Sequence, residues 1–449
     1  MDLNFGKSAF VRDRGNYPEI SVVNMIAEQE QVESGLNLLS RPGLGLAATR
    51  GAGPVYQVFK QPGVLSDTLF TVSGANLYAE ATNVGAIDFD GTPQVSLAGY
   101  ADRVFVTGGK NLFQYNGTAF SSVTVPDGNY VLKVLTGASR LIVLIKGTQT
   151  FYWSDVLNST IGALSFATAE NVPDGLLDAV FVGDTLVLFG SNSVEHWPVT
   201  QDATLPFQPL IGRTFDVGIK NTGASCKWNS NYIWVTNQNR VCITSPDNII
   251  SFDGLETRIQ NSATAQLFKF DLDGDEYIGM ALENETWIYR PSVKTWSTFE
   301  SYGYDKFVPS TYSGGYFGSS IDGKLYSWTT DYTDPDTILE RKFSAFSPIN
   351  TDGVVVDNLS LRVNSGQTPN ITGIYSEPKI EMRFSRDGGQ TFSDWRSRSL
   401  GKQGEYRKKV YWTGLGMFSY PGALFEFRVT DPITFRISSV TINEPIGGR

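Results

Sequence analysis

Short apolar runs alternate with clusters of turn-forming residues along most of the chain, and the middle of the sequence shows almost no helical periodicity. Seven segments share one pattern. A polar residue opens an apolar, β-branched or aromatic run, a few Gly, Asn, Ser, Asp or Lys residues follow, and a second run rich in Tyr, Phe and Trp ends the unit. This pattern predicts β-hairpins, because such side chains favour pleated strands and such turn residues tolerate positive φ.

The hairpins recur at a regular spacing. Equivalent positions are 36, 38, 43, 47, 46 and 38 residues apart along the chain. They are Leu77, Phe113, Phe151, Val194, Val241, Trp287 and Leu325. A period of about 40 residues is typical of β-propeller blades, each of which leaves two faces for its neighbours to cover. The pattern favours seven blades. Six blades, with one hairpin in another element, and a long β-sandwich built from hairpins are the alternatives.

Beyond residue 351 the pattern changes to strongly alternating strands linked by Gly, Pro and Asp turns. We therefore expect an all-β protein with three parts. Residues 1–50 form a segment that packs on the ring or closes it, residues 51–350 form the β-propeller, and residues 351–449 form a β-sandwich-like domain for assembly.

The hydrophobic content agrees with several domains, and the net charge disfavours some classes of function. The chain has 449 residues, 41% of them hydrophobic, which is enough for two or three cores. Its net charge of −10 disfavours general nucleic-acid binding, yet suits a surface past which DNA moves without sticking. No stretch approaches the roughly 20 apolar residues of a membrane span.

The reactive side chains are few. The two cysteines, Cys226 and Cys242, fall on neighbouring predicted strands, so a disulfide is conceivable, but two buried reduced thiols are the favoured interpretation. The single histidine, His196, lies in a repeat strand and is expected to be a packing or surface residue. We expect no cofactor and no enzymatic activity.

One motif raises the question of a glycan-cleaving enzyme. The stretch "SRDGGQTFSDW" fits the Asp-box turn of sialidase propellers. Its residues are Ser385, Asp387, Gly389, Thr391 and Phe392. Such a turn is a folding device, in which the carboxylate accepts backbone N–H bonds and glycine permits a tight bend. The motif occurs once and outside the repeats, so we expect a structural role and keep a glycan site as the alternative.

A second acidic motif resembles the start of a calcium loop. In "FKFDLDGDEYIG" the acids are Asp271, Asp273 and Asp275. Gly274 precedes the third acid instead of following it, and strands are expected on both sides. An Asp-Gly hairpin turn is the favoured interpretation, with calcium binding as the alternative.

One region departs from the acidic average. Between Arg383 and Lys409 there are eight basic and three acidic side chains. Among the basic residues, the candidates for partner docking are Arg396, Arg398, Arg407, Lys408 and Lys409. A solvated strand face is the alternative to docking an acidic protein or phosphates.

Several stretches in order carry a resemblance to a known family. They are "YPEISVVNMIAE", "LLSRPGLG", "FVGDTLVLFGSNSVEHW", "LFKFDLDGDEYIGMAL" and "KKVYWTGLG" followed by "LFEFRVTDPITFRISSVTIN". Together they resemble the packaged-DNA stabilisation, or tail nozzle, proteins of short-tailed bacteriophages. The resemblance spans nearly the whole chain and rests on the colinear order of the motifs.

The resemblance implies a structural protein of the virion tail that is assembled in the host cytoplasm. It implies a homo-hexameric ring below the portal and adaptor, the head-to-tail connector. Such a ring extends the DNA channel, helps retain packaged DNA without sequence-specific binding, and supports a tail needle or plug and tailspikes or fibres. A glycan-binding or glycan-cleaving tail protein and a cellular propeller adaptor are the competing hypotheses.

Overall fold

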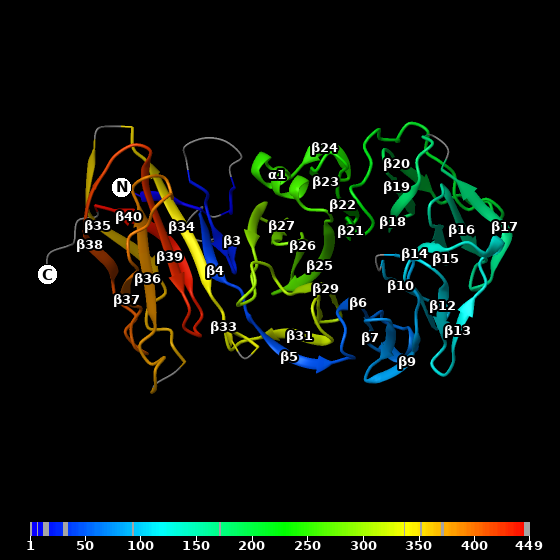
Figure 1. The fold of residues 1–449 in the computed structure, drawn as a ribbon, viewed down its shortest axis with the longest axis horizontal. Helices are drawn as coiled ribbons and strands as arrows, with labels where there is room; N and C mark the ends of the chain where they lie inside the picture. Colours follow the sequence, from blue (N-terminus) through cyan, green and yellow to red (C-terminus); the bar gives the residue numbers. More distant parts are fainter. Residues whose placement is uncertain are drawn as a thin grey trace.

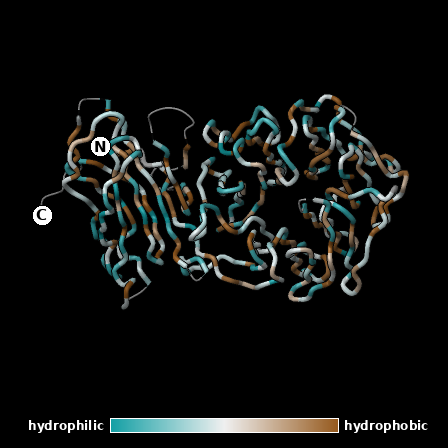
Figure 2. Tube along the Cα trace, in the orientation of Figure 1, coloured by the Kyte–Doolittle hydropathy of each residue, from teal (hydrophilic) through white to brown (hydrophobic). Residues whose placement is uncertain are grey.

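The computed structural model describes residues 2–6, 8–11, 18–29, 35–91, 94–169, 172–335, 337–350, 353–369 and 372–443. The described chain is almost entirely β-structure, and α1 (Asp253–Asn261) is its only α-helix. The molecule is elongated, with a ring of small sheets beside a β-sandwich (Figure 1). Hydrophobic segments run through both parts (Figure 2). No described helix has the length and apolar character needed to cross a membrane.

The ring consists of antiparallel sheets, and all but the last are built from consecutive strands. The first sheet has β6 (Val55–Phe59), β7 (Phe70–Ser73), β8 (Asn76–Ala79) and β9 (Thr82–Ala86), and the second has β10 (Ser96–Tyr100), β11 (Arg103–Thr107), β12 (Leu112–Tyr115) and β13 (Phe120–Val123). The third has β14 (Val131–Gly137), β15 (Arg140–Ile145), β16 (Thr150–Ser154) and β17 (Ile161–Thr168), and the fourth has β18 (Leu176–Val182), β19 (Thr185–Gly190) and β20 (Val194–Pro198).

The remaining ring sheets follow the same plan. The fifth has β21 (Ser225–Trp228), β22 (Asn231–Val235), β23 (Val241–Ile243) and β24 (Ser245–Ile249), and the sixth has β25 (Gln266–Leu272), β26 (Asp275–Ala281), β27 (Thr286–Arg290) and β28 (Thr295–Thr298). The last has β29 (Pro309–Ser313), β30 (Tyr316–Ser319), β31 (Lys324–Thr329) and β5 (Gly43–Thr49). Short 3-10 turns, η1 (Leu65–Asp67) and η2 (Pro126–Gly128), lie in connections.

The first strands of successive sheets contact one another in a closed circuit, from β6 through β10, β14, β18, β21, β25 and β29 back to β6. The repeat positions predicted from the sequence lie on the third strands of these sheets, from Leu77 on β8 to Leu325 on β31. Each sheet buries both faces against its neighbours. The ring closes through the N-terminal strand β5, which pairs with β31 in the register Leu44↔Trp328. The propeller prediction is therefore confirmed.

The sandwich contains strands from both ends of the chain. One sheet has the order β2 (Val22–Val23), β34 (Arg341–Pro348), β39 (Gly422–Val429), β36 (Lys379–Ser385) and β37 (Arg396–Ser399). The other has β3 (Met25–Gln29), β4 (Leu36–Ser40), β40 (Arg436–Ile442), β35 (Val354–Val363) and β38 (Val410–Phe418). Strand β1 (Asp2–Phe5) pairs with both β34 and β40. Phe343 and Phe427 stack in the core between the sheets, with ring centroids 4.7 Å apart.

This pairing differs from the expected division of the chain. Strand β34 ends at Pro348, yet it pairs with the sandwich strand β39 over its whole length. The sandwich thus begins before the expected boundary at residue 351. The first 50 residues divide between two partners, because β1 to β4 complete the sandwich while β5 completes the ring. Sequence alternation alone does not show which sheet a strand joins.

The chain passes between the two parts twice, and a buried arginine holds these crossings together. Arg41, between β4 and β5, is fully buried and donates from Nη1 and Nη2 to Asp334 at 3.0 and 2.8 Å. Asp334 belongs to β32 (Thr333–Asp334), which pairs with β33 (Thr337–Ile338) just before β34. Arg41 Nε also donates to Asn24 Oδ1 at 2.9 Å. The guanidinium therefore ties both crossings to the sandwich.

A second buried arginine lies beside it. Arg341 donates to the backbone carbonyls of Val429, Asp431 and Ile433. Burial, and then the charge of Arg41, lower the pKa of Arg341 to about 9. Two guanidinium groups thus share a dry region in which Asp334 supplies a bidentate carboxylate partner. Removing one partner of such a pair is strongly destabilising, because the other partner is left as an uncompensated buried charge.

This junction predicts a large effect of a small substitution. Asp334→Asn should destabilise the protein by about 3 kcal/mol or more, because Arg41 keeps its buried charge and loses its carboxylate. Thermal unfolding followed by calorimetry measures the shift. Asp331→Asn, at an exposed position three residues away, is the matched control and should leave the unfolding temperature unchanged. Equal unfolding temperatures for the two variants would show that the Arg41–Asp334 contact does not stabilise the protein.

Candidate functional site

The Asp-box residues form a tight turn between β36 and β37. Asp387 Oδ1 accepts hydrogen bonds from the backbone N–H groups of Gln390 and Thr391 at 3.0 and 2.9 Å. The hydroxyls of Ser385 and Thr391 donate to the same carboxylate at 2.6 and 2.5 Å. Gly389 has φ of +99°, a conformation that glycine adopts without a steric cost. The side chain of Asp387 is thus occupied by the turn itself.

These bonds fix the ionisation of Asp387. Hydrogen bonds from Ser385 and then from Thr391 hold the pKa of this carboxyl far below its usual value. The group is therefore ionised at neutral pH and cannot act as a general acid. The arrangement supports the structural interpretation of the motif.

The aromatic residues of this turn pack on arginines. The guanidinium carbon of Arg383 lies 4.1 Å from the ring centroid of Phe392 and 4.7 Å from that of Trp395. Arg428 lies 4.3 Å from the Trp395 ring. Arg383 also pairs with Glu426 on the adjacent strand β39, at 2.6 Å. Phe392 and Trp395 thus pack the turn against arginine side chains on the sandwich surface.

The basic docking candidates divide into two groups. Arg396 packs its guanidinium over Phe384 at 5.2 Å, and Arg398 Nε donates to the carbonyl of Tyr411 at 3.0 Å. Arg386 likewise donates to the carbonyls of Leu415 and Met417. These contacts join the β36–β37 hairpin to the edge strand β38 and satisfy part of its exposed backbone. Arg396 and Arg398 are therefore engaged within the sandwich.

The other group lies on the connection before β38. Arg407 and Lys409 are exposed, while Lys408 is half-buried and pairs with Glu377 and Glu405 at 3.5 and 3.4 Å. The neighbouring Tyr406 is exposed as well. The structure thus presents Arg407 and Lys409 to solvent, so these two residues are the more accessible candidates for contact with an acidic partner.

The acids of the calcium-like motif do not converge. Asp273 and Gly274 form the β25–β26 hairpin turn with φ of +51° and +83°, as the Asp-Gly interpretation predicts. Asp275 forms an ion pair with Arg290 on β27. Asp271 lies on β25, opposite Glu276. Over the described residues, no group of three or more His, Cys, Asp or Glu side chains is placed to hold a metal ion.

Both cysteines are free thiols. Cys226 lies on β21 and Cys242 on β23, with β22 between them. Burial raises the pKa of each thiol to about 12. The favoured interpretation expects two buried thiols, but only Cys242 is buried, while Cys226 is partly exposed.

His196 is a buried structural residue. Its Nδ1 lies 2.7 Å from the carbonyl of Arg213, and its Nε2 lies 2.8 Å from the hydroxyl of Tyr232. Because a carbonyl only accepts, Nδ1 carries the proton. Burial lowers the pKa of His196 to about 4, so the ring is neutral at pH 7. Through its contact with Tyr232 on β22, His196 on β20 links the fourth and fifth ring sheets.

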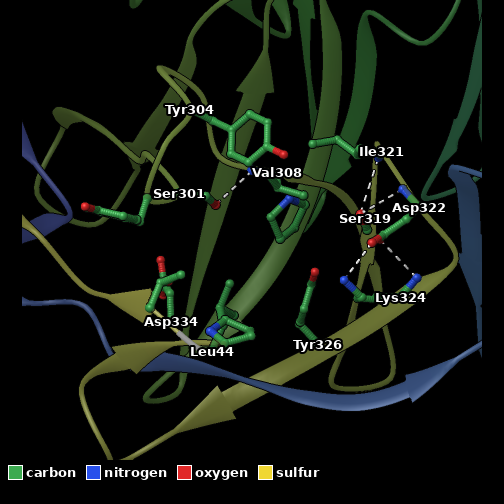
Figure 3. A pocket seen from close by; sticks show the side chains of 14 residues that line it. Leu44, Ser301, Tyr304, Val308, Ser319, Ile321, Asp322, Lys324, Tyr326 and Asp334 are labelled. Carbon is green, nitrogen blue, oxygen red and sulfur yellow. Dashed lines mark hydrogen bonds and ion pairs between the residues drawn. The ribbon is translucent and has the colours of Figure 1, made fainter.

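A small pocket that no sequence motif predicts lies beside the last ring sheet. It encloses about 160 Å³ and is lined by residues of the 301–309 and 319–337 segments together with Leu44. Tyr304 and Tyr326 lie on opposite sides of the pocket, and Asp322 bonds to Lys324 and Ser319 at one side (Figure 3). Burial opposes its ionisation, but hydrogen bonds from Lys324 and Ser319 hold the pKa of Asp322 below its usual value.

Two family models match the chain in order. One, described as Bacteriophage P22 Gp10, beta-propeller, matches residues 3–245, more than half of the chain. The other, described as Bacteriophage P22 Gp10, beta-sandwich, matches residues 343–444. No curated protein matches the chain by sequence.

Solved structures with similarity to the chain include other propellers. The Cps50 (Swd1) β-propeller domain of Myceliophteria thermophila is 9% identical, with a TM-score of 0.43, over 64% of this chain and 100% of that chain. YCF48 from Cyanidioschyzon merolae is 12% identical, with a TM-score of 0.41, over 64% of this chain and 98% of that chain. The designed protein Ika8 is 12% identical, with a TM-score of 0.39, over 73% of this chain and 98% of that chain.

Acidification should test the buried histidine. The folded-state pKa near 4 lies below the unfolded value of about 6.5, so the unfolded chain takes up the proton first and stability falls as pH drops. Between pH 7.5 and 5 the wild-type protein should lose about 2 kcal/mol through this group. His196→Gln should lack that loss, as denaturant unfolding at the two pH values would measure. An identical pH dependence in both proteins would contradict a neutral buried ring.

The Asp-box turn predicts a local effect. Asp387→Ala should raise the hydrogen-exchange rates of the Gln390 and Thr391 amides several-fold, because both lose their acceptor. Mass spectrometry of the peptide that spans the turn measures these rates. Asp394→Ala, at an exposed position on the same connection, serves as the control. Unchanged protection in Asp387→Ala would show that the carboxylate does not hold the turn.

Proposed function

Because the chain belongs to the bacteriophage P22 Gp10 family, and is thus a structural protein of the virion that stabilises packaged DNA, we propose that it forms the nozzle of a short phage tail. In this proposal, copies form a homo-hexameric ring below the portal and adaptor. The ring extends the DNA channel and carries a tail needle or plug and tailspikes or fibres. The observation that carries the proposal is the ordered match of the propeller and sandwich models along one chain.

The architecture supports a mechanical role. The ring sheets bury their faces against one another, and the Arg41–Asp334 contact fixes the ring to the sandwich through buried groups. A protomer with such a junction behaves as one stiff block, which suits a component under the pressure of packaged DNA. Membership of a family of structural virion proteins also supports a non-enzymatic role. The engaged, ionised carboxylate of Asp387 agrees with this role, because it leaves no general acid in the Asp-box.

Electrostatics supports passage of DNA without binding. Each protomer carries a net charge of −10, so a cyclic assembly surrounds its axis with negative potential. Phosphates are repelled from such a surface, and the protein makes no sequence-specific contact with DNA. A basic, DNA-gripping bore in the assembled ring would contradict this lining.

The exposed basic residues suit attachment to an acidic neighbour. Arg407 and Lys409 lie next to the partly paired Lys408 on one connection of the sandwich. We assign this segment to docking on the adaptor ring, where complementary charge speeds encounter and fixes register. Tail assembly then takes place in the host cytoplasm.

Charge reversal tests the docking role. Arg407→Glu with Lys409→Glu should weaken binding to the purified portal–adaptor complex by about tenfold or more at low salt, without lowering the unfolding temperature. Sedimentation and electron micrographs of the mixture measure the bound fraction. The control, Lys60→Glu with Lys227→Glu, makes the same charge change at exposed positions of the propeller. Unchanged docking, or an equal loss in the control, would refute the assignment.

A further inference from the structure

The pocket beside the last ring sheet, here called the last-sheet pocket, combines exposed aromatic rings with a few polar groups. Its walls come from the β28–β29 connection, from β30 and β31, and from the β32–β33 hairpin. Tyr302 and Tyr304 lie on the β28–β29 connection and are 56% and 48% exposed, and Tyr326 lies across the pocket on β31 (Figure 3). Concave sites with aromatic walls and a few convergent polar groups are typical of small-ligand binding.

Hydrogen bonds within the β28–β29 connection hold the aromatic wall in place. The backbone N–H of Ser301 donates to the carbonyl of Lys306 at 3.0 Å, and the N–H of Tyr304 donates to the carbonyl of Ser301 at 2.9 Å. The N–H of Val308 donates to the hydroxyl of Ser301 at 3.1 Å. Because the wall is already folded, a ligand binds it without a large cost of ordering the chain.

The charged groups of the pocket are already paired with opposite charges. Asp322 pairs with Lys324 at 2.8 Å, and Asp334 holds Arg41 through both of its carboxylate oxygens. Among the described residues that line the pocket, Asp322, Lys324 and Asp334 are the charged ones. An anionic or cationic ligand would enter as an unpaired charge or would have to break one of these pairs, and both are costly. The pocket therefore favours an uncharged ligand.

The Asp322–Lys324 pair also determines what an uncharged ligand must offer. The two side chains are 35% and 45% exposed, so both contact water. A ligand that fills the pocket displaces part of this water. A hydrocarbon or proline ring supplies no hydrogen bond in its place, whereas a ligand with several hydroxyl groups does. The ligand that fits both the tyrosines and this pair therefore has an apolar face and a rim of hydroxyls.

From these features we propose that the last-sheet pocket binds one uncharged sugar ring. The C–H face of such a ring packs on a tyrosine, and its hydroxyls donate to Asp322 and bond the tyrosine hydroxyls. The cavity of about 160 Å³ suits a single ring, because drug-sized ligands occupy pockets of ~300 Å³ or more. The site shares no residue with the Asp-box turn, and it is independent of the proposed assembly.

The lining supports binding of a sugar without its cleavage. Glycoside hydrolysis generally uses two carboxyl groups, one of which is protonated and acts as the acid. Burial opposes the ionisation of Asp322, but hydrogen bonds from Lys324 and Ser319 keep the pKa of its carboxyl below the usual value. The carboxylate of Asp334 is engaged by Arg41. The bound sugar is therefore released intact.

Titration of the whole protein with methyl glucoside, methyl galactoside and methyl mannoside tests the proposal. Saturation-transfer NMR should detect binding of at least one of them at millimolar concentration, the range expected for so small a ligand. Tyr304→Ala and Asp322→Asn should each weaken this binding by about tenfold or more, because the first removes a packing face and the second an ionised acceptor. The matched controls are Tyr130→Ala, at a 41% exposed tyrosine elsewhere on the ring, and Asp305→Asn, at an exposed position of the same connection outside the pocket. Both controls should bind as the wild type does.

Two further probes separate the sugar from other occupants. A methyl sialoside carries a carboxylate, and N-acetylproline methylamide carries a ring without hydroxyls, so each should bind at least about tenfold more weakly than the best glycoside. Equal or tighter binding of either probe would overturn the proposal. So would no binding of the three glycosides, or binding that neither pocket variant weakens.

A conservative variant separates loss of the site from loss of the fold. Tyr304→Phe keeps the packing face, so its affinity should lie between those of the wild type and Tyr304→Ala, and both variants should unfold at the wild-type temperature. An affinity of Tyr304→Phe as low as that of Tyr304→Ala would contradict packing of the sugar on this ring. Docking on the portal–adaptor complex is measured separately, so failure of the sugar site leaves the nozzle proposal intact.

Discussion

A β-sheet that is apolar on both faces is stable only when another surface covers each face, and this constraint organises the whole molecule. The ring sheets satisfy it by packing on one another in a closed circuit, from β6 around to β29. The last ring sheet is completed by β5, a strand that precedes the first ring sheet in the chain and pairs with β31. The circuit then has no sheet without a neighbour, so its rigidity follows from closure more than from any single contact.

The same requirement explains how the two parts of the molecule are joined. The segments that enter and leave the ring must turn sharply beside two packed cores, where water is excluded. Arg41 satisfies the polar groups there by bonding Asp334 and Asn24, and its guanidinium carbon lies 5.5 and 5.2 Å from the ring centroids of Phe299 and Phe307. A planar group with several donors suits this position better than an ammonium would. The junction is specific because few other side chains satisfy it.

The sequence predicted the features that arise from local patterns. Repeated hairpins such as that around Leu77 come from neighbours in the chain, and the turn around Asp387 comes from hydrogen bonds among residues 385–391. Features that depend on distant partners were not predicted. The placement of β1 with β34, the pairing of Arg41 with Asp334, and the engagement of Arg398 by the Tyr411 carbonyl each join residues whose proximity only the fold determines. For the same reason β34 was assigned to the propeller, since its alternation matches strands of either part.

The sandwich is assembled from both termini, and this affects how the protein is made. A ribosome releases β1 to β4 first, and their partners β34 and β40 follow between 319 residues (Val23 to Lys342) and 439 residues (Asp2 to Thr441) later. Synthesis of that length takes roughly 15 to 90 seconds. During that interval the early strands present unpaired backbone edges in the crowded host cell. The ring sheets, whose partners are adjacent in the chain, can fold meanwhile and bring the two termini together. Growth of the chain therefore sets an order of events in which the central part matures before the part that contains both ends.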